Sequence, residues 1–205
     1  MQSIQTVSEN TIYVGASDRR LAKFENLFPI PRGVSYNAYV ILDEKTALLD
    51  TADASGGAQV LENGAAALDG RKLDYLIVDH MEPDHAAMIE AVLVRWPELR
   101  LVVNAKTLPM LKMYFPTDSA AIDDALVVKE GDTLDLGKHK LTFVMAPMVH
   151  WPEVMMTFDT TTGTLFSADA FGTFGALEGA LFADEVDFAG KWLDDARRYY
   201  ANIVG

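Results

Sequence analysis

The densest group of side chains able to bind a metal ion or move a proton is the run Asp79–His85, which reads DHMEPDH. Because Pro83 disfavours the α conformation at the residue before it, Glu82 should be extended. Residues two apart in an extended segment point the same way, so His80, Glu82 and Asp84 can converge on one side. The chain has no cysteine, so a metal ion would have to bind to histidine, aspartate and glutamate. The run therefore predicts a functional site rather than a solvated surface.

The elements on either side of this run have the pattern of an α/β protein. The mostly apolar run Leu73–Val78 is typical of a buried strand, and apolar residues three and four apart predict a helix over 86–95, ended by Pro97. α/β proteins place functional groups at the carboxyl ends of strands. Asp84 could instead cap the helix, but a capping box needs Glu or Gln at position 87, which is alanine.

The whole chain of 205 residues predicts one layered α/β domain with sheets in the middle. We expect helices over 56–68, 107–114 and 188–204, and strands over 11–14, 36–42, 46–49, 101–103, 126–129, 133–136, 140–145, 154–158 and 164–166. The sequence has no signal peptide and no apolar run near the roughly 20 residues that span a bilayer, which predicts a cytoplasmic protein. A net charge of −13 disfavours nucleic acid and anionic membranes as partners.

The run also resembles a known metal motif. H-x-E-x-D-H is similar to the H-x-H-x-D-H motif of the metallo-β-lactamase superfamily, with Glu82 where the hydrolases carry their second histidine. In this form it resembles the flavodiiron proteins, or A-type flavoproteins. Further similar segments are GVSYNAY at 33–39, LLDT at 48–51, APMVHWP at 146–152 and SADAFG at 167–172, so the resemblance covers nearly all of the chain. It implies an α/β fold of the metallo-β-lactamase-like αββα sandwich type.

The resemblance implies a centre of two iron ions. It assigns His80, Glu82 and His150 to one iron, Asp84 and His85 to the second, and Asp169 to a bridge between them. The three carboxylates offset three of the four positive charges of two divalent ions, and a carboxylate-rich set suits iron or manganese better than zinc. Zinc has no redox chemistry, so Glu82 favours reduction over hydrolysis.

The implied reaction is reduction of dioxygen to water or of nitric oxide to nitrous oxide. Its electrons would come from FMN or from a rubredoxin- or flavoprotein-type donor, and the intact protein would form homodimers or homotetramers. Two alternatives stay open: a zinc-dependent hydrolase of the same superfamily, which acts through metal-bound hydroxide, and a non-catalytic diiron module that binds O2 or NO.

The chain departs from the family in two ways. The family supplies a last histidine to the second iron, but no histidine follows Asp169 here. A flavodoxin-like FMN domain is also absent: Thr160–Thr164 is superficially similar to a flavodoxin phosphate loop, but it lies between two predicted strands, so we expect a hairpin turn there and no FMN site. We therefore expect residues 1–205 to be a C-terminally incomplete diiron domain, with FMN only on a missing or separate domain.

A few further residues carry expectations of their own. Trp151 and Phe171, neighbours of the assigned ligands, either line an apolar pocket for small gases or pack in the core. His139, in a polar turn, is expected at the surface. Met81 and Met148 are expected to fill the core, and the acidic stretch 184–187 should favour the N-terminal end of the last helix.

Overall fold

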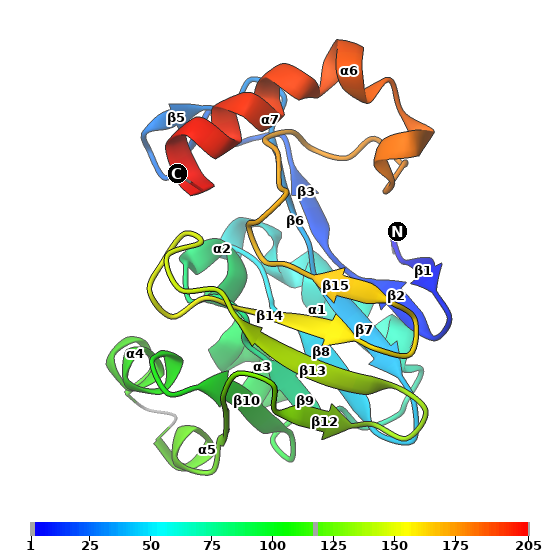
Figure 1. Ribbon diagram of the computed structural model, residues 1–205, viewed down its shortest axis with the longest axis vertical. Helices are drawn as coiled ribbons and strands as arrows, with labels where there is room; N and C mark the ends of the chain where they lie inside the picture. Colours follow the sequence, from blue (N-terminus) through cyan, green and yellow to red (C-terminus); the bar gives the residue numbers. More distant parts are fainter. Residues whose placement is uncertain (1–2, 117–118, 205) are drawn as a thin grey trace.

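The computed structural model describes residues 3–116 and 119–204 and has two β-sheets stacked face to face (Figure 1). The larger sheet has seven strands in the order β1-β2-β7-β8-β9-β10-β11. Strands β1, β2, β7 and β8 pair antiparallel, and β8 to β11 pair parallel. Their bounds are β1 Gln5–Ser8, β2 Thr11–Tyr13, β7 Tyr39–Leu42, β8 Thr46–Leu49, β9 Tyr75–Ile77, β10 Arg100–Asn104 and β11 Leu126–Val128.

The second sheet is antiparallel throughout, in the order β12-β13-β14-β15. Its strands are β12 Thr133–Asp135, β13 Lys140–Met145, β14 Met155–Asp159 and β15 Thr164–Phe166. Two small antiparallel ribbons extend from one end of the sandwich: β3 (Ala16–Asp18) with β6 (Val34–Tyr36), and β4 (Lys23–Phe24) with β5 (Phe28–Pro29).

Two apolar cores hold the layers together. One lies between the sheets, where Leu49 and Ile77 of the larger sheet meet Leu141, Phe143 and Met155 of the smaller one. The other lies between the larger sheet and the helices. Because β8, β9 and β10 are covered on both faces, their sequences are near-continuous apolar runs rather than alternating ones.

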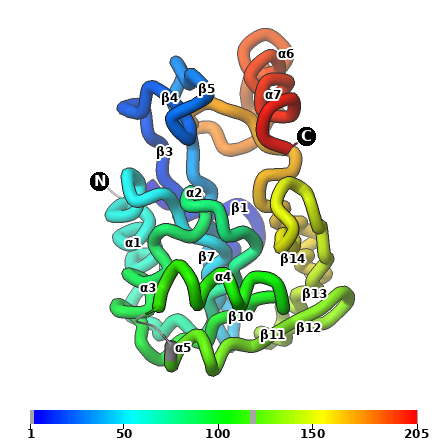
Figure 2. Tube along the Cα trace, turned by 90° about the vertical axis from the view of Figure 1, so that its left-hand side faces the viewer, coloured from blue at the N-terminus to red at the C-terminus, as the bar shows by residue number. Residues whose placement is uncertain are grey.

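The helices lie mainly on the outer face of the larger sheet, and Figure 2 shows α1 and α3 on one side of the layers and β13 and β14 on the other. Helices α6 and α7 lie across one end of the sandwich (Figure 1). No helix that would span a bilayer is present among the described residues. The helices are α1 Ala54–Leu68, α2 Pro83–Ala86, α3 Ile89–Arg95, α4 Thr107–Tyr114, α5 Ser119–Asp123, α6 Phe188–Lys191 and α7 Leu193–Tyr199, with a 3₁₀ turn at Ala183–Glu185 and a π turn at Tyr200–Val204.

The expected fold class, an α/β sandwich of stacked sheets, is confirmed. Within the described ranges, helices cover the larger sheet and none packs over the outer face of the smaller one (Figure 1). The described layers are therefore helix, sheet and sheet, without the second helical layer of the full αββα arrangement.

Three of the predicted elements are divided in the structure. The predicted strand 36–42 is β6 and β7, separated at Asn37, and the predicted helix 188–204 is α6, α7 and the π turn. The predicted helix 86–95 is α2 and α3, and it begins three residues early, with Pro83 in the first turn. Proline favours this position because its fixed φ suits a helix and its missing N–H has no intrahelical partner there.

Several smaller expectations can be checked directly. Residues 160–163 form the expected turn between the antiparallel strands β14 and β15, and Thr164 begins β15. Asp187 accepts a hydrogen bond from the Gly190 N–H at the start of α6. Met81 is buried in the core. The expectation that Met148 fills the core is wrong, because Met148 lies in the loop between β13 and β14 and is 65 % exposed.

His139 was expected at the surface, and this expectation is wrong. Its side chain is fully buried, with Nδ1 2.8 Å from Asp159 Oδ2, and its backbone N–H donates to Asp43. The polar residues around it suggested a solvated turn, but the pairing of β13 with β14 brings Asp159 over the imidazole.

We predict that Asp159→Ala lowers the free energy of unfolding by roughly 2–3 kcal/mol, because it leaves a buried histidine N–H without an acceptor. Asp159→Asn should cost less, since the amide oxygen can still accept from His139. Chemical denaturation of the two variants measures the difference, and an alanine variant as stable as the wild type would contradict the prediction.

Candidate metal centre

The predicted site residues lie at one end of the sandwich, where strands of both sheets end. His80 follows β9, and His150 lies in the loop from β13 to β14. Asp169 follows β15. Because parallel neighbours end at the same edge and the second sheet stacks on the first, segments far apart in sequence meet here. All six residues predicted as ligands are brought together, and their role as ligands stays a prediction.

Four donor side chains form a first group: His80, Glu82, His150 and Asp169, with donor atoms all within 4.8 Å of one another. His80 Nε2 lies 3.1 Å from Asp169 Oδ2 and 3.3 Å from Glu82 Oε2. His150 Nε2 lies 2.6 Å from Glu82 Oε2 and 3.3 Å from Asp169 Oδ2. Two imidazoles and two carboxylates thus face a common point.

Three donor side chains form a second group: Asp84, His85 and Asp169. His85 Nε2 lies 3.3 Å from Asp169 Oδ1 and 3.8 Å from Asp84 Oδ2. Asp169 therefore presents Oδ2 to the first group and Oδ1 to the second, which is the arrangement a bridging carboxylate needs.

The sequence pattern placed Asp84 with His80 and Glu82, and this part of the prediction is wrong. Glu82 has the expected extended backbone, with φ −60° and ψ 145°. The alternation of side chains ends there, however, because helix α2 begins at Pro83. Asp84 consequently belongs with His85 and Asp169 in the second group, as the family resemblance implied.

Two buried carboxylates that the sequence reasoning did not single out lie within hydrogen-bond distance of the Nδ1 atoms of His80 and His85, the ring nitrogens that face away from the donor groups. Glu153 Oε1 lies 2.7 Å from His80 Nδ1, and Asp50 Oδ2 lies 2.9 Å from His85 Nδ1. Metal-binding histidines usually direct their second ring nitrogen to such a partner. The sequence could have indicated Asp50, because it directly follows the apolar strand β8, much as His80 lies just after the apolar strand β9.

The backbone around the site adopts conformations that L-residues seldom use. Asp50, Ala168 and Phe171 have positive φ angles of 54°, 49° and 66°. Such residues store strain that the surrounding structure must hold, and they gather at functional sites. Two of them flank Asp169, so the chain bends sharply on either side of the shared carboxylate.

The carboxylates of the first group change the pKa values of its histidines. Burial opposes protonation of His80, but hydrogen bonds to Asp169, Glu153 and Glu82 outweigh it and raise the pKa to about 10. Burial also opposes protonation of His150, but hydrogen bonds to Asp169 and Glu82 outweigh it and raise its pKa to about 9. Burial raises the pKa of Asp169, but His85, His150 and His80 lower it well below its usual range.

The second group has a different balance. Burial opposes the charged form of His85, but Asp84, Asp169 and Asp50 raise its pKa well above the usual value. Burial also raises the pKa of Asp84 to about 7, because the nearby histidines only partly compensate. Glu25, in the turn after β4, is a further residue that the sequence did not indicate: its hydrogen bond with Glu82 raises its pKa to about 7.

We predict that metal binding at pH 7 releases between three and four protons. The three histidines are cationic in the metal-free chain and must become neutral to bind a metal, and Asp84, with a pKa of about 7, loses its partial proton as well. The raised pKa values mean that acid competes with the metal, so affinity should increase from pH 7 to pH 8. Calorimetric titration in buffers of different ionisation enthalpy counts the protons released. Binding without proton release, or with equal affinity at both pH values, would contradict the prediction.

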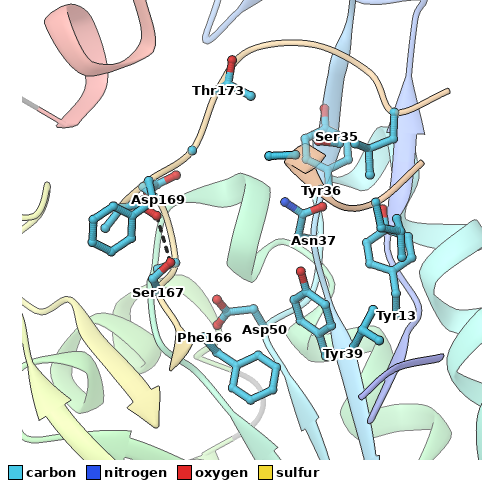
Figure 3. Close-up of a pocket in the computed structure, with 18 of the residues that line it drawn as sticks. Tyr13, Ser35, Tyr36, Asn37, Tyr39, Asp50, Phe166, Ser167, Asp169 and Thr173 are labelled. Atoms are coloured by element: carbon cyan, nitrogen blue, oxygen red, sulfur yellow. Dashed lines mark hydrogen bonds between the residues drawn. The ribbon is translucent and has the colours of Figure 1, made fainter. Parts of the chain in front are cut away.

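A cavity of about 460 Å³ opens beside the second group (Figure 3). Asp50 and Tyr39 come to it from the larger sheet, and Ser167 and Asp169 from the loop after β15. Phe171 lines this cavity and is 76 % exposed, so of its two expected positions the one in the core is wrong. Trp151 instead packs edge-on against the His80 ring, with centroids 5.3 Å apart.

Helix α7 contributes one more contact to the site. The buried Tyr199 hydroxyl donates a hydrogen bond to Asp169 Oδ1, and its ring packs edge-on against Phe174 with centroids 5.1 Å apart. The shared carboxylate is therefore held from a helix as well as by the histidines.

A protein-family model described as "ODP family beta lactamase" matches residues 34–200. The chain belongs to this family. The match begins at strand β6, ends in the π turn, and includes all six predicted ligands. The sequence resemblance to the metallo-β-lactamase superfamily is thereby confirmed.

Curated relatives of this ODP-family chain carry the names of nitric oxide reductases. It is 37% identical over 200 residues to "Nitric oxide reductase" of Moorella thermoacetica, covering 97% of this chain and 49% of that protein. It is 36% identical over 200 residues to "Anaerobic nitric oxide reductase flavorubredoxin" of Klebsiella pneumoniae, covering 97% of this chain and 40% of that protein. The chain thus spans about half the length, or less, of the curated relatives it matches.

Solved structures similar to this ODP-family domain are flavodiiron proteins and an oxidoreductase. The flavodiiron protein from Giardia intestinalis matches with a TM-score of 0.91 and 28% identity, over 99% of this chain and 48% of that one. Rubredoxin oxygen:oxidoreductase from Desulfovibrio gigas matches with a TM-score of 0.90 and 32% identity, over 98% of this chain and 49% of that one. The resemblance to flavodiiron proteins is confirmed.

Proposed function

We propose that this domain binds two iron ions and is the diiron domain of an oxygen or nitric oxide reductase. The observation that carries the proposal is the division of six side chains into two donor groups that share Asp169. The names of the relatives, nitric oxide reductase and rubredoxin oxygen:oxidoreductase, support the same reaction class.

The donor atoms fit a pair of cations. Among the described residues, two buried carboxylate oxygens of the site have no hydrogen-bond partner, Glu82 Oε1 and Asp84 Oδ1. A buried anionic oxygen without a partner is costly, and a bound cation would remove that cost. Three carboxylates and three imidazoles make a set that suits iron, whereas structural zinc sites favour thiolate and imidazole.

Each residue has a proposed role in this centre. His80, Glu82 and His150 hold one iron, Asp84 and His85 hold the other, and Asp169 bridges them. Two ferrous ions held there would supply two electrons, which is enough to convert two NO into nitrous oxide and water. Reduction of O2 to water takes four electrons, so the other two would come from the electron donor. The Tyr199 hydroxyl orients Asp169, and Trp151 excludes water from one side of the His80 ring.

The charge of the adjoining cavity favours a small uncharged substrate. Its lining includes four carboxylates, those of Asp50, Asp79, Asp84 and Asp169, and neither lysine nor arginine is among the described lining residues. A carboxylate-bearing or phosphate-bearing substrate would need a cationic side chain to bind it, whereas O2 and NO carry no charge and need none. The described lining therefore disfavours a zinc hydrolase that acts on such an anionic substrate.

The proposal extends to electron donors and assembly. Electrons would come from FMN on a flavodoxin-like domain or from a separate rubredoxin- or flavoprotein-type donor, in line with the words flavorubredoxin and rubredoxin in the relatives' names. We also propose that the intact protein is cytoplasmic, since the reaction joins soluble donors to a dissolved gas, and that it forms the homodimers or homotetramers that the family resemblance implies.

Anaerobic reconstitution of the chain with ferrous iron tests the proposal. We expect about two irons per chain and, with a chemical reductant and mediator, consumption of O2 or formation of nitrous oxide from NO. The zinc-loaded chain, which cannot change oxidation state, is the matched control. Zinc as the only retained metal, with turnover of a thioester or β-lactam, would overturn the proposal in favour of a hydrolase. Reversible O2 binding without reduction would overturn it in favour of a gas-binding module.

A further inference from the structure

Glu153 is a buried carboxylate at the metal centre that is not itself a member of either donor group. It follows Pro152 in the same loop that carries His150, and its side chain is fully buried. Oε1 receives two hydrogen bonds from the neighbouring loop, from His80 Nδ1 at 2.7 Å and from the Met81 N–H at 3.0 Å. Glu153 therefore joins two of the three loops that supply the first donor group.

The contact with Glu153 determines which way the His80 ring faces. Because Nδ1 points to Glu153, Nε2 points to the first group, 3.1 Å from Asp169 Oδ2 and 3.3 Å from His150 Nε2. A carboxylate that accepts the Nδ1 proton leaves the Nε2 lone pair free for a metal, and it increases the electron density on the ring.

Glu153 is itself held in place by the larger sheet. Its carbonyl oxygen accepts a hydrogen bond from Asn104 Nδ2 at 2.5 Å, and Asn104 Oδ1 accepts from the Thr107 N–H at the start of α4. The next residue but one, Met155, donates its N–H to the Asp79 carbonyl at 3.0 Å. The backbone that carries Glu153 is thus fixed to strand β10 and to the β9 loop, which is what a residue that orients another side chain requires.

We infer that Glu153 is a positioning residue, which holds His80 as the Nδ1–H tautomer with Nε2 directed at the first metal. The inference rests on the metal-binding part of the proposed function, and it is independent of the reaction that the centre performs. Asp50 has the same relation to His85, so each of the two ions would have one histidine supported by a buried carboxylate.

The chain contains a matched control for this contact. The His139–Asp159 pair has the same kind of bond, Nδ1 to carboxylate at 2.8 Å, and it is equally buried, but neither residue belongs to a donor group. Glu153→Ala and Asp159→Ala therefore remove the same kind of interaction, one beside the proposed metal and one away from it.

Zinc binding, measured by competition with a chromophoric chelator, tests the inference without any redox step. We expect Glu153→Ala to bind one of two zinc ions about 10- to 100-fold more weakly, the range seen when such a support is removed. Glu153→Gln should recover most of that affinity, because its amide oxygen still accepts the Nδ1 proton. Asp159→Ala should bind both ions as the wild type does.

Nitrogen-15 NMR of the zinc-loaded chain supplies the second measurement. The wild type should show His80 with a hydrogen-bonded Nδ1 proton, a signal that Glu153→Ala loses and Glu153→Gln shifts. Unchanged affinity and tautomer in Glu153→Ala would overturn the inference, as would an equal loss of zinc in Asp159→Ala. A wild type that binds two zinc ions but, loaded with iron, reduces neither gas would overturn the proposed reaction alone.

Discussion

Replacing Asp169 by alanine is expected to remove both metal ions, whereas replacing any other ligand removes one. Asp169 is the single side chain that belongs to both donor groups, through Oδ2 to the first and Oδ1 to the second. Its loss also leaves three histidines without their common anionic partner. The affinity for the more tightly bound of the two ions should fall by more than about 100-fold. A supporting residue outside the ligand set contributes at most about that much, and a ligand shared by both ions should contribute more.

His150→Ala is the matched control for this prediction, because His150 belongs only to the first group. It should leave one ion bound by Asp84, His85 and Asp169. Metal content after desalting, together with circular dichroism to confirm folding, separates the two results. An Asp169→Ala chain that still holds one ion per molecule would contradict the role of Asp169 as a bridge.

Glu82→His is expected to shift metal preference from iron toward zinc. Glu82 Oε2 lies between His80 Nε2 at 3.3 Å and His150 Nε2 at 2.6 Å, so an imidazole there would create a group rich in nitrogen donors. The change also removes a negative charge from a buried site. The ratio of zinc to iron affinity should rise by roughly an order of magnitude, and reduction of O2 or NO should fall accordingly.

Competition between zinc and ferrous iron for the same protein measures this shift directly. Glu82→Asp retains the charge and an oxygen donor, so it should keep the preference for iron even if affinity falls. If Glu82→His and Glu82→Asp show the same zinc-to-iron ratio, the charge and donor type at this position do not decide the metal.

Much of the fold was predictable because local signals and tertiary structure agree. The apolar run ending at Val78 became a buried parallel strand, and Pro83 fixed the extended backbone of Glu82, as expected. The division of the helix at residues 83–95 was harder to predict. Pro83 keeps Glu82 extended and also suits the first turn of a helix, so the sequence alone does not fix where the helix begins. The meeting of His150 and Asp169 with the β9 loop depends on the stacking of two sheets, which the resemblance supplied and periodicity did not.

The supporting carboxylates show where sequence reasoning stops. Glu153 and Asp50 are separated from their histidines by 73 and 35 positions, so no local pattern connects them. His139 was misplaced for the same reason, since its partner Asp159 comes from the neighbouring strand. A polar residue can be read as solvated or as buried and paired, and only the tertiary neighbours distinguish the two.

The position of the donor groups, at a seam where loops of one sheet meet loops of the other, gives the ions a mechanical role. Cations bound there would connect the two halves of the sandwich, and each ion would stabilise the folded chain by about 2.7 kcal/mol when free metal stands at a hundred times its dissociation constant. Removing the ions with a chelator should therefore lower the melting temperature, and the contacts between the loops of the two sheets should be the first to break on heating.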